Sequence, residues 1–383
     1  MRFPGFEGEW KETIIGDVAD VIGGGTPDTT VSSYWDGDIA WFTPTEIGHN
    51  KYVRKSKRTI SEKGLCNSSA KLLPLGAILL TTRATIGETS ITLNACTTNQ
   101  GFQSLISKSN IDNEFLYYLI GTKKKDLFEK ACGSTFMEIS ANEVRKIRIK
   151  APTKQEQVRI AKFLAILDER IETQIGAIRK IESLITGITS KVSHSNNVKK
   201  MYLKDLLMER TERNVGHHEV YSVSVSEGVV NQVEYLGRSF AAAETSHYSV
   251  ARYGDIIYTK SPTGSFPYGI VKRSAIPDPV AVSPLYGVYQ PINENIGIYL
   301  HQYFCSTINA HNYLHRLIQK GAKNTINITN QRFLENTVPI PDEVTLEKYV
   351  KVIDSLTQKL KNEKCLLESY RRQKFYLLKN MFV

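Results

Sequence analysis

The residues of this chain best suited to chemistry are basic and amide side chains in short polar segments, and the chemistry that they suit is binding of a polyanion. The densest segment places five cations around a tyrosine within eight residues of the N-terminal half: Lys51, Arg54, Lys55, Lys57 and Arg58. Lysine and arginine spaced in this way can contact successive phosphates of a nucleic acid. A solvated surface loop is the alternative interpretation of the same pattern.

Further candidates follow the apolar run 76–82 of the N-terminal half. Arg83 and Thr85 come directly after it, where a loop can carry a side chain into a groove of DNA. Asn99 and Gln100 lie in a polar segment downstream. Arginine pairs bidentately with guanine, and asparagine or glutamine with adenine. For these residues a structural hydrogen bond is an equally good interpretation.

Two glycine-rich turns complete the candidates of the N-terminal half. In the first, 23–27, the amides near Gly25 and Thr26 could approach a phosphate or a base edge. A tight turn that needs positive φ is the alternative. Ser134 and Thr135 follow a glycine in the second turn and are candidates because this turn corresponds in position to a polar loop of the C-terminal half.

The C-terminal half carries its candidates in two loops. One loop follows the apolar run that ends near residue 259, in the same way that Arg83 follows the apolar run 76–82. The other loop corresponds in position to the turn at residues 133–135. The candidate residues of the two loops are Lys260, Ser261, Thr263, Ser265, Lys323 and Asn324.

Catalytic motifs are not found in the sequence. No Gly-Lys dipeptide is present, which excludes the phosphate-binding loop, and no Pro-Pro dipeptide, which excludes the catalytic motif of amino-methyltransferases. His311 and His315 have a metal-ligand spacing, but no acidic residue or cysteine accompanies them at a matching position. We therefore expect a chain without catalytic residues, metal or cofactor of its own.

Composition points to a binding protein of the cytoplasm. The 383 residues carry a formal charge of +10 and the pI is about 9.1, which favours a nucleic acid partner. The five cysteines are scattered without a CxxC pair, which fits a reducing compartment. No signal peptide and no apolar run of about 18 residues are apparent, so no membrane association is expected.

Two long amphipathic helices must position these loops. Apolar residues recur at steps of three and four over about 154–192 and 343–381, which predicts helices of roughly 60 Å each. Each single apolar face needs a partner, and the simplest partner is the other helix in an antiparallel pair. The alternative is that each helix packs on its own domain. The residues predicted to form the interface are Leu164, Leu167, Ile171, Ile175, Ile178, Ile181, Ile185, Ile353, Leu356, Leu360 and Leu367.

Each long helix follows about 150 residues of mixed strand and helix character, and the two stretches share landmarks. The glycine turn and apolar run at 76–82 resemble 254–260, and the apolar segment 147–149 resembles 338–340, with an offset near 180 to 190 residues. An internal repeat is therefore predicted. The fold class is α/β (α+β), with two globular domains separated by two long helices that form an antiparallel coiled coil with pseudo-twofold repetition. The expected boundaries are 1–151, 152–197, 198–341 and 342–383.

The motifs of the N-terminal half resemble a known family. They lie at 23–27, 34–41, 59–65, 98–102 and 152–167, and together they resemble the first target-recognition domain and first long helix of specificity subunits from type I restriction–modification systems. The C-terminal half lacks the GGTP and TNQG strings and resembles a divergent recognition domain of that family.

The resemblance implies a bipartite double-stranded DNA target, with one domain for each half-site and the helices as spacer. It also implies two modification subunits, which use S-adenosylmethionine to methylate adenine at N6, and two restriction subunits, which use ATP and Mg²⁺. Alternatives are a recognition subunit of a methylation-only or other phage-defence complex, a self-sufficient nuclease or methyltransferase, and a structural oligomerisation protein.

Overall fold

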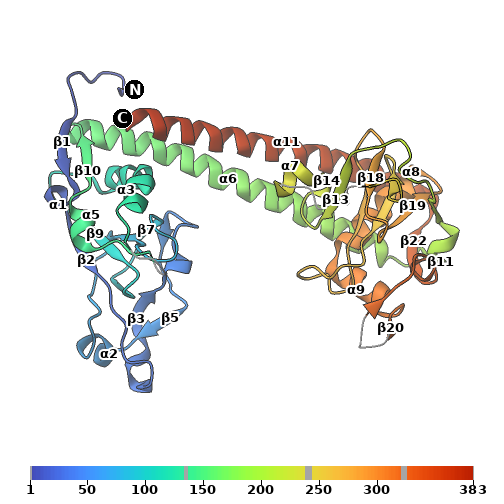
Figure 1. Ribbon diagram of the computed structural model, residues 1–383, viewed down its shortest axis with the longest axis horizontal. Helices are drawn as coiled ribbons and strands as arrows, with labels where there is room; N and C mark the ends of the chain where they lie inside the picture. Colours follow the sequence, from blue (N-terminus) through green and yellow to red (C-terminus); the bar gives the residue numbers. More distant parts are fainter. Residues whose placement is uncertain (1, 133–136, 238–243, 321–325, 383) are drawn as a thin grey trace. The chain divides into compact units, whose positions relative to one another are not determined.

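The computed structural model describes residues 2–132, 137–237, 244–320 and 326–382 (Figure 1). The chain divides into two compact units: unit 1 is Met1–Gln174 with Leu366–Val383, and unit 2 is Ile175–Cys365. Each unit therefore contains one globular domain and one end of each long helix. The predicted boundaries separated whole helices from the domains, whereas the compact units divide both helices near their middle.

The described residues of unit 1 form three sheets. The largest has the strand order β2-β9-β6-β7-β4, the second has the order β5-β3-β8, and β1 pairs with β10. The strands of these sheets are β1 (Lys11–Ile14), β2 (Ala19–Gly23), β3 (Trp35–Phe42), β4 (Tyr52–Val53), β5 (Arg58–Ile60), β6 (Ile78–Leu80), β7 (Thr89–Thr92), β8 (Cys96–Thr98), β9 (Gln103–Ser107) and β10 (Arg148–Ala151).

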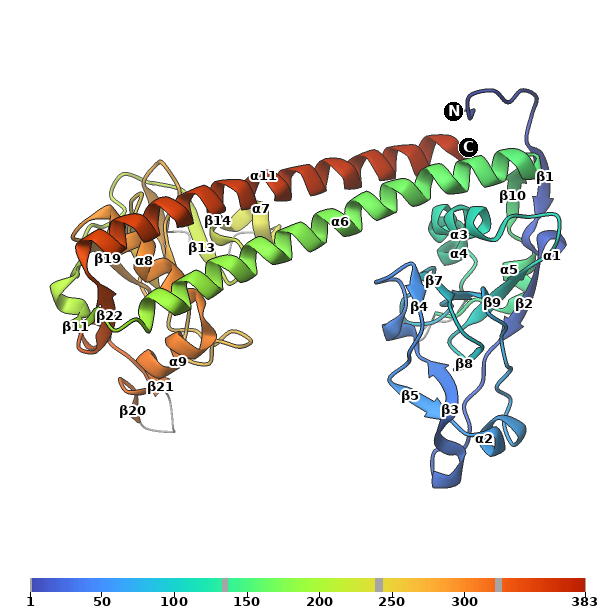
Figure 2. The ribbon, with the colours of Figure 1, turned by 180° about the vertical axis from the view of Figure 1, so that it is seen from behind.

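The domain in unit 1 has five short α-helices among its described residues. They are α1 (Ile15–Val18), α2 (Glu62–Cys66), α3 (Asn113–Thr122), α4 (Lys124–Glu129) and α5 (Ala141–Arg145). Helix α2 lies beside the three-stranded sheet. Phe115 and Leu119 of α3 are buried in one core with Ile78 and Leu80 of β6. Within this unit the three-stranded sheet and α2 lie at the end far from α6, as Figure 1 and Figure 2 show.

Unit 2 is built in the same way. Its sheets have the orders β12-β19-β16-β17 and β14-β13-β18-β15, and two further pairs are β11-β22 and β20-β21. The strands are β11 (Val198–Tyr202), β12 (Leu207–Glu209), β13 (Val220–Ser224), β14 (Gly228–Asn231), β15 (Ser249–Ala251), β16 (Ile256–Tyr258), β17 (Val271–Arg273), β18 (Val280–Val282), β19 (Gly287–Pro291), β20 (Gln319–Lys320), β21 (Ile326–Asn327) and β22 (Thr337–Pro341). Its short helices are α7 (Gln232–Leu236), α8 (Glu294–Cys305), α9 (Thr307–His315) and α10 (Asn330–Phe333).

The two units repeat one topology. The order β2-β9-β6-β7 of unit 1 returns as β12-β19-β16-β17, and the parallel pair β3–β8 returns as β13–β18. The turns before the equivalent central strands β6 and β16 both place a glycine at positive φ, with Gly76 at 86° and Gly254 at 87°. Only glycine adopts such a conformation without strain. The repeat predicted from these landmarks is confirmed.

The long helices are α6 (Lys154–Ser193) and α11 (Glu343–Met381), close to the predicted ranges. In unit 1 the Lys374 amine lies 2.5 Å from the Asp168 carboxylate. In unit 2 Lys364 lies 3.2 Å from Glu182, and the Tyr349 and Thr189 hydroxyls lie 2.8 Å apart. In both units residues late in one helix meet residues early in the other, so the pairing is antiparallel as predicted.

The predicted interface residues turn inward. The buried ones are Leu164, Leu167, Ile171, Ile178, Ile181, Ile185, Ile353 and Leu367, and the partly buried ones are Ile175, Leu356 and Leu360. Leu164 belongs to the same core as α3, and Ile181, Ile185 and Ile353 belong to the same core as α8. Helix pairing and packing on the domain therefore occur together. Among the described helices none combines the length and apolar content needed to cross a bilayer.

Candidate nucleic-acid interface

In unit 1 three segments meet at the end of the central strand β6. The Thr82 amide donates to the Gly101 carbonyl at 2.8 Å, and the Ile139 amide donates to the Thr82 carbonyl at 3.3 Å. The loop after β6 closes as a tight turn, in which the Gly87 amide donates to the Thr81 carbonyl at 2.9 Å and Ala84 has φ of 58°. This turn projects Arg83 beside the polar segment at 99–101.

Arg83 is held but accessible. Its guanidinium lies 2.7 Å from the Glu138 carboxylate, and the two side chains are 42% and 38% exposed. An ion pair with this exposure contributes about 1 kcal/mol or less. A guanine edge or a phosphate can therefore compete with Glu138 for the guanidinium, and Thr85 lies exposed on the same turn. Glu138 is 55 positions away from Arg83 in the chain, so no local pattern predicted this partner.

Gln100 and Asn99 have different roles. The Thr26 hydroxyl donates to the Gln100 side-chain oxygen at the surface, which places both near the Arg83 turn. Asn99 is half-buried, and its side-chain oxygen accepts from the Gly101 amide at 2.9 Å. Thr26 and Gln100 therefore remain candidate contacts, whereas Asn99 shapes the turn.

Gly25 packs against backbone and does not present its amide to a ligand. The amide donates to the Thr98 carbonyl at 2.8 Å, and the Gly25 carbonyl accepts from the Trp41 indole at 2.9 Å. A Cβ at this residue would lie 2.4 Å from the backbone nitrogen of Ala70, closer than real contacts allow. Its φ is not positive. Neither predicted alternative holds, because the glycine is required for the close approach of two backbone segments.

The basic segment divides into two parts. Arg54, Lys55, Lys57 and Arg58 are exposed, and the Arg58 guanidinium lies 3.5 Å from the ring centroid of Trp35. Stacking on an aromatic ring leaves the guanidinium edge able to donate to phosphate. For Lys51 the structure contradicts the predicted phosphate contact. It is 12% exposed, forms an ion pair with Glu114 and donates to the Tyr118 hydroxyl at 2.9 Å, so its amine is not available to DNA.

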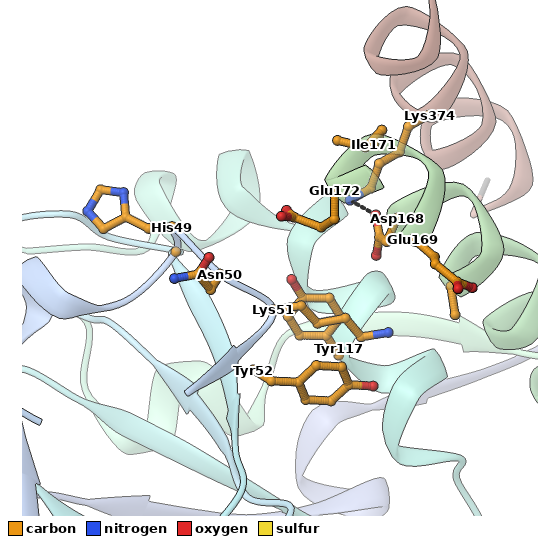
Figure 3. Close-up of a pocket in the computed structure, with 12 residues that line it drawn as sticks. His49, Asn50, Lys51, Tyr52, Tyr117, Asp168, Glu169, Ile171, Glu172 and Lys374 are labelled. Carbon is orange, nitrogen blue, oxygen red and sulfur yellow. Dashed lines mark ion pairs between the residues drawn. The ribbon is translucent and has the colours of Figure 1, made fainter. Parts of the chain in front are cut away.

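Lys51 lines a pocket of about 560 Å³ within unit 1 (Figure 3). Tyr52 and Tyr117 lie on one side, and Asp168 of α6 faces them with its ion pair to Lys374. Two further carboxylates of α6 line the pocket, Glu169 and Glu172, and neither has an ion-pair partner among the described residues. Uncompensated carboxylates repel phosphate, so this pocket is unsuited to a phosphate of DNA.

In unit 2 the loop after β16 replaces the Arg83 turn. Ser261, Thr263 and Ser265 are exposed, while Phe266 is buried and anchors the loop. Thr263 and Phe266 exchange two backbone hydrogen bonds, of 3.1 and 2.8 Å, which form a small protruding turn. Lys260 at the base of this turn is partly buried. Burial lowers the pKa of its ammonium, and the negative charge of Glu209 offsets part of that shift.

Four predicted contacts, Ser134, Thr135, Lys323 and Asn324, lie outside the described residues and stay predictions. The two histidines with metal-ligand spacing, His311 and His315, stack at 5.4 Å, and both lie against the Tyr268 ring. Within the described ranges no group of three or more metal-ligating side chains is present.

The first globular domain resembles a class of DNA specificity domains. Residues 7–183 match the family described as type I restriction modification DNA specificity domain. This part of the chain, which comprises the first globular domain and most of α6, is therefore similar to that family. The resemblance stated from the N-terminal motifs is confirmed.

Among individual relatives, the MjaIX specificity subunit of Methanocaldococcus jannaschii is 38% identical over 185 residues, which cover 44% of this chain and 43% of the relative. The EcoR124I/EcoR124II specificity subunit of Escherichia coli is 29% identical over 175 residues, with the same coverage of 44% and 43%. The matched part thus spans less than half the length of each relative.

Solved structures resemble the chain over its whole length. The type I restriction–modification S subunit from M. genitalium has a TM-score of 0.61 at 14% identity, and the match covers 100% of this chain and 99% of that one. A chain from a study of assembly and conformational transition of the type I R-M system has a TM-score of 0.56 at 15% identity, covering 98% of both chains. At these identities the likeness shows the fold, and it confirms the predicted architecture.

Proposed function

We propose that the chain is the DNA sequence-recognition subunit of a type I restriction–modification complex. The observation that carries this proposal is that one scaffold occurs twice and presents a different polar loop after the equivalent strand, β6 or β16. Each domain then recognises one half of a bipartite target. The match of residues 7–183 to the specificity-domain family supports the assignment to DNA.

The chain acts without catalysing a reaction. In the proposed complex two modification subunits supply adenine-N6 methylation with S-adenosylmethionine, and two restriction subunits supply cleavage with ATP and Mg²⁺. The modification subunits dock along the long helices. Aromatic side chains that remain exposed on these helices in unit 1 support this docking: Phe163, Phe375 and Tyr376. The complex works in the cytoplasm, where its DNA lies.

The test is co-expression with a modification subunit, followed by long-read mapping of N6-methyladenine in host DNA. We expect one bipartite motif with an unspecified middle. If the complex can be purified but host DNA contains no methylated motif, the proposal is contradicted. If the chain binds no duplex DNA even in that complex, a structural role is favoured. A motif without ATP-dependent cleavage of unmethylated target identifies the methylation-only alternative.

The helices also make a geometric prediction. Deleting about seven residues, two helical turns, from each of α6 and α11 removes roughly 10 Å. The unspecified middle of the motif should then shorten by about 3 base pairs, since a turn of DNA of roughly 34 Å contains about 10 base pairs. An unchanged gap after matched deletions contradicts the spacer role, and a single-helix deletion that disrupts assembly is the control.

A further inference from the structure

Away from the loops assigned to DNA, unit 2 brings three reactive groups together. Cys305 and His301 lie one turn apart on α8, and Lys272 lies on the adjacent strand β17. The Lys272 amine is 3.5 Å from the Cys305 sulfur, and Nε2 of His301 is 3.9 Å from it. No role proposed above uses this cluster.

The histidine is oriented as a donor to the sulfur. The backbone amide of Arg273 donates to Nδ1 of His301 at 3.1 Å. Because Nδ1 accepts this hydrogen bond, the proton of the neutral ring is on Nε2, which faces Cys305. The Lys272 ammonium can only donate. The sulfur therefore has donors on two sides, the environment that favours a thiolate.

Lys272 gives an independent reason for a negative sulfur. The residue is 7% exposed, and among the described residues no carboxylate lies within ion-pair distance of its amine. A buried ammonium needs a countercharge. Of its neighbours, Cys305 is the group in contact that can supply one.

Among the described residues a further titratable group beside Cys305 comes from α11. It is Tyr349, whose pKa is raised by burial, so that this neighbour is uncharged. Burial alone would raise the pKa of Cys305, but the interactions of the sulfur with His301 and Lys272 outweigh it and lower the pKa to about 6. Cys96, buried without such neighbours, shows the opposite effect, with a pKa raised to about 11.

We propose that Cys305, held between Lys272 and His301, is a reactive thiolate and a modification site for small oxidants of the peroxide class. The residue is partly exposed. The thiolate sulfur attacks one peroxide oxygen, an S–O bond forms and the O–O bond breaks. The leaving hydroxide takes one proton and becomes water. The sulfur is oxidised by two electrons to sulfenic acid, and hydrogen peroxide is reduced.

The test measures iodoacetamide labelling of each cysteine in the full-length chain between pH 5 and 9 by peptide mass spectrometry. Cys305 should reach half of its maximal rate near pH 6 and change little above about pH 7. Cys96 should stay unlabelled until the pH is far higher. A Cys305 rate that still rises about tenfold per pH unit between pH 6 and 8 overturns the thiolate.

Two variants separate charge from packing. Lys272→Met should move the Cys305 profile to higher pH by about one unit or more, and Lys272→Arg should restore it, because arginine keeps the positive charge. Equal profiles in all three proteins overturn the role of Lys272. In the peroxide arm, treatment at pH 7 with dimedone present should leave an adduct on the Cys305 peptide. Rapid alkylation of Cys305 without any adduct overturns the assignment of peroxide.

Discussion

The two domains share a scaffold and differ where the central strand ends. In unit 1 the chain turns back at once and carries Arg83 beside Glu138. In unit 2 it continues past Lys260 into a longer loop with exposed hydroxyls, held by the buried Phe266. Because the strands on either side pair in the same order, this difference lies in a surface loop on a shared sheet. A repeated scaffold with exchanged loops is the arrangement that two different half-sites require.

The scaffolds also differ at the other end of the same strand. Gly76 is followed by buried Ala77, whereas Gly254 is followed by buried Asp255. The Asp255 carboxylate is 2.7 Å from the Arg210 guanidinium and accepts from the Arg252 amide at 2.8 Å. At this position unit 1 has the methyl side chain of Ala77, and unit 2 has the ion pair between Asp255 and Arg210.

The largest effect should come from breaking that ion pair. Asp255→Ala removes the closer carboxylate from the Arg210 guanidinium, which is 17% exposed, and leaves it the longer contact of 3.7 Å to Glu212, so the free energy of unfolding should fall by about 3 kcal/mol. Urea denaturation measures the loss. The double variant Asp255→Ala/Arg210→Met should recover part of it. A loss below about 1 kcal/mol in the single variant would show that the pair does not hold the strand.

Equivalent core residues should be equally sensitive in the two domains. Leu119 of α3 is 1% exposed and Leu300 of α8 is 0% exposed, at corresponding positions after the helix start. Leu119→Ala and Leu300→Ala should each cost about 2–5 kcal/mol, through lost burial and the cavity that remains. The same urea titrations measure both. If only one substitution is costly, the packing of the two domains is not equivalent.

The N-terminal caps of α3 and α8 occupy equivalent positions, and a smaller loss of stability is expected when either is removed. The Asp112 side chain accepts from the Phe115 amide at 2.9 Å, and the Asn293 side chain accepts from the Ile296 amide at 2.9 Å. Replacing either cap by alanine should cost about 1 kcal/mol. Serine at each position is the control and should retain most of the stability. Unequal costs would mean that one helix start is held by its packing alone.

Much of the fold could be predicted from the sequence because its signals are local. The apolar period of α6 and α11, the glycines before β6 and β16 and the order of the landmarks depend on neighbouring residues. The site was harder to predict because it depends on long-range contacts. Lys51 is neutralised by Glu114, and Gly25 is closed in by Ala70 and Thr98. No spacing along the chain signals those approaches.

The central claim is that each domain recognises its own half of one target. Its most direct test maps N6-methyladenine in cells that contain a modification subunit and either Arg83→Ala or a variant with alanine at Ser261, Thr263 and Ser265. We predict that the first variant relaxes or abolishes recognition of bases in one half of the motif only, and the second in the other half only. A single good base contact contributes about 1–3 kcal/mol of discrimination, so the change should be large enough to see. If both variants alter the same half, or if neither alters the motif, the claim is contradicted.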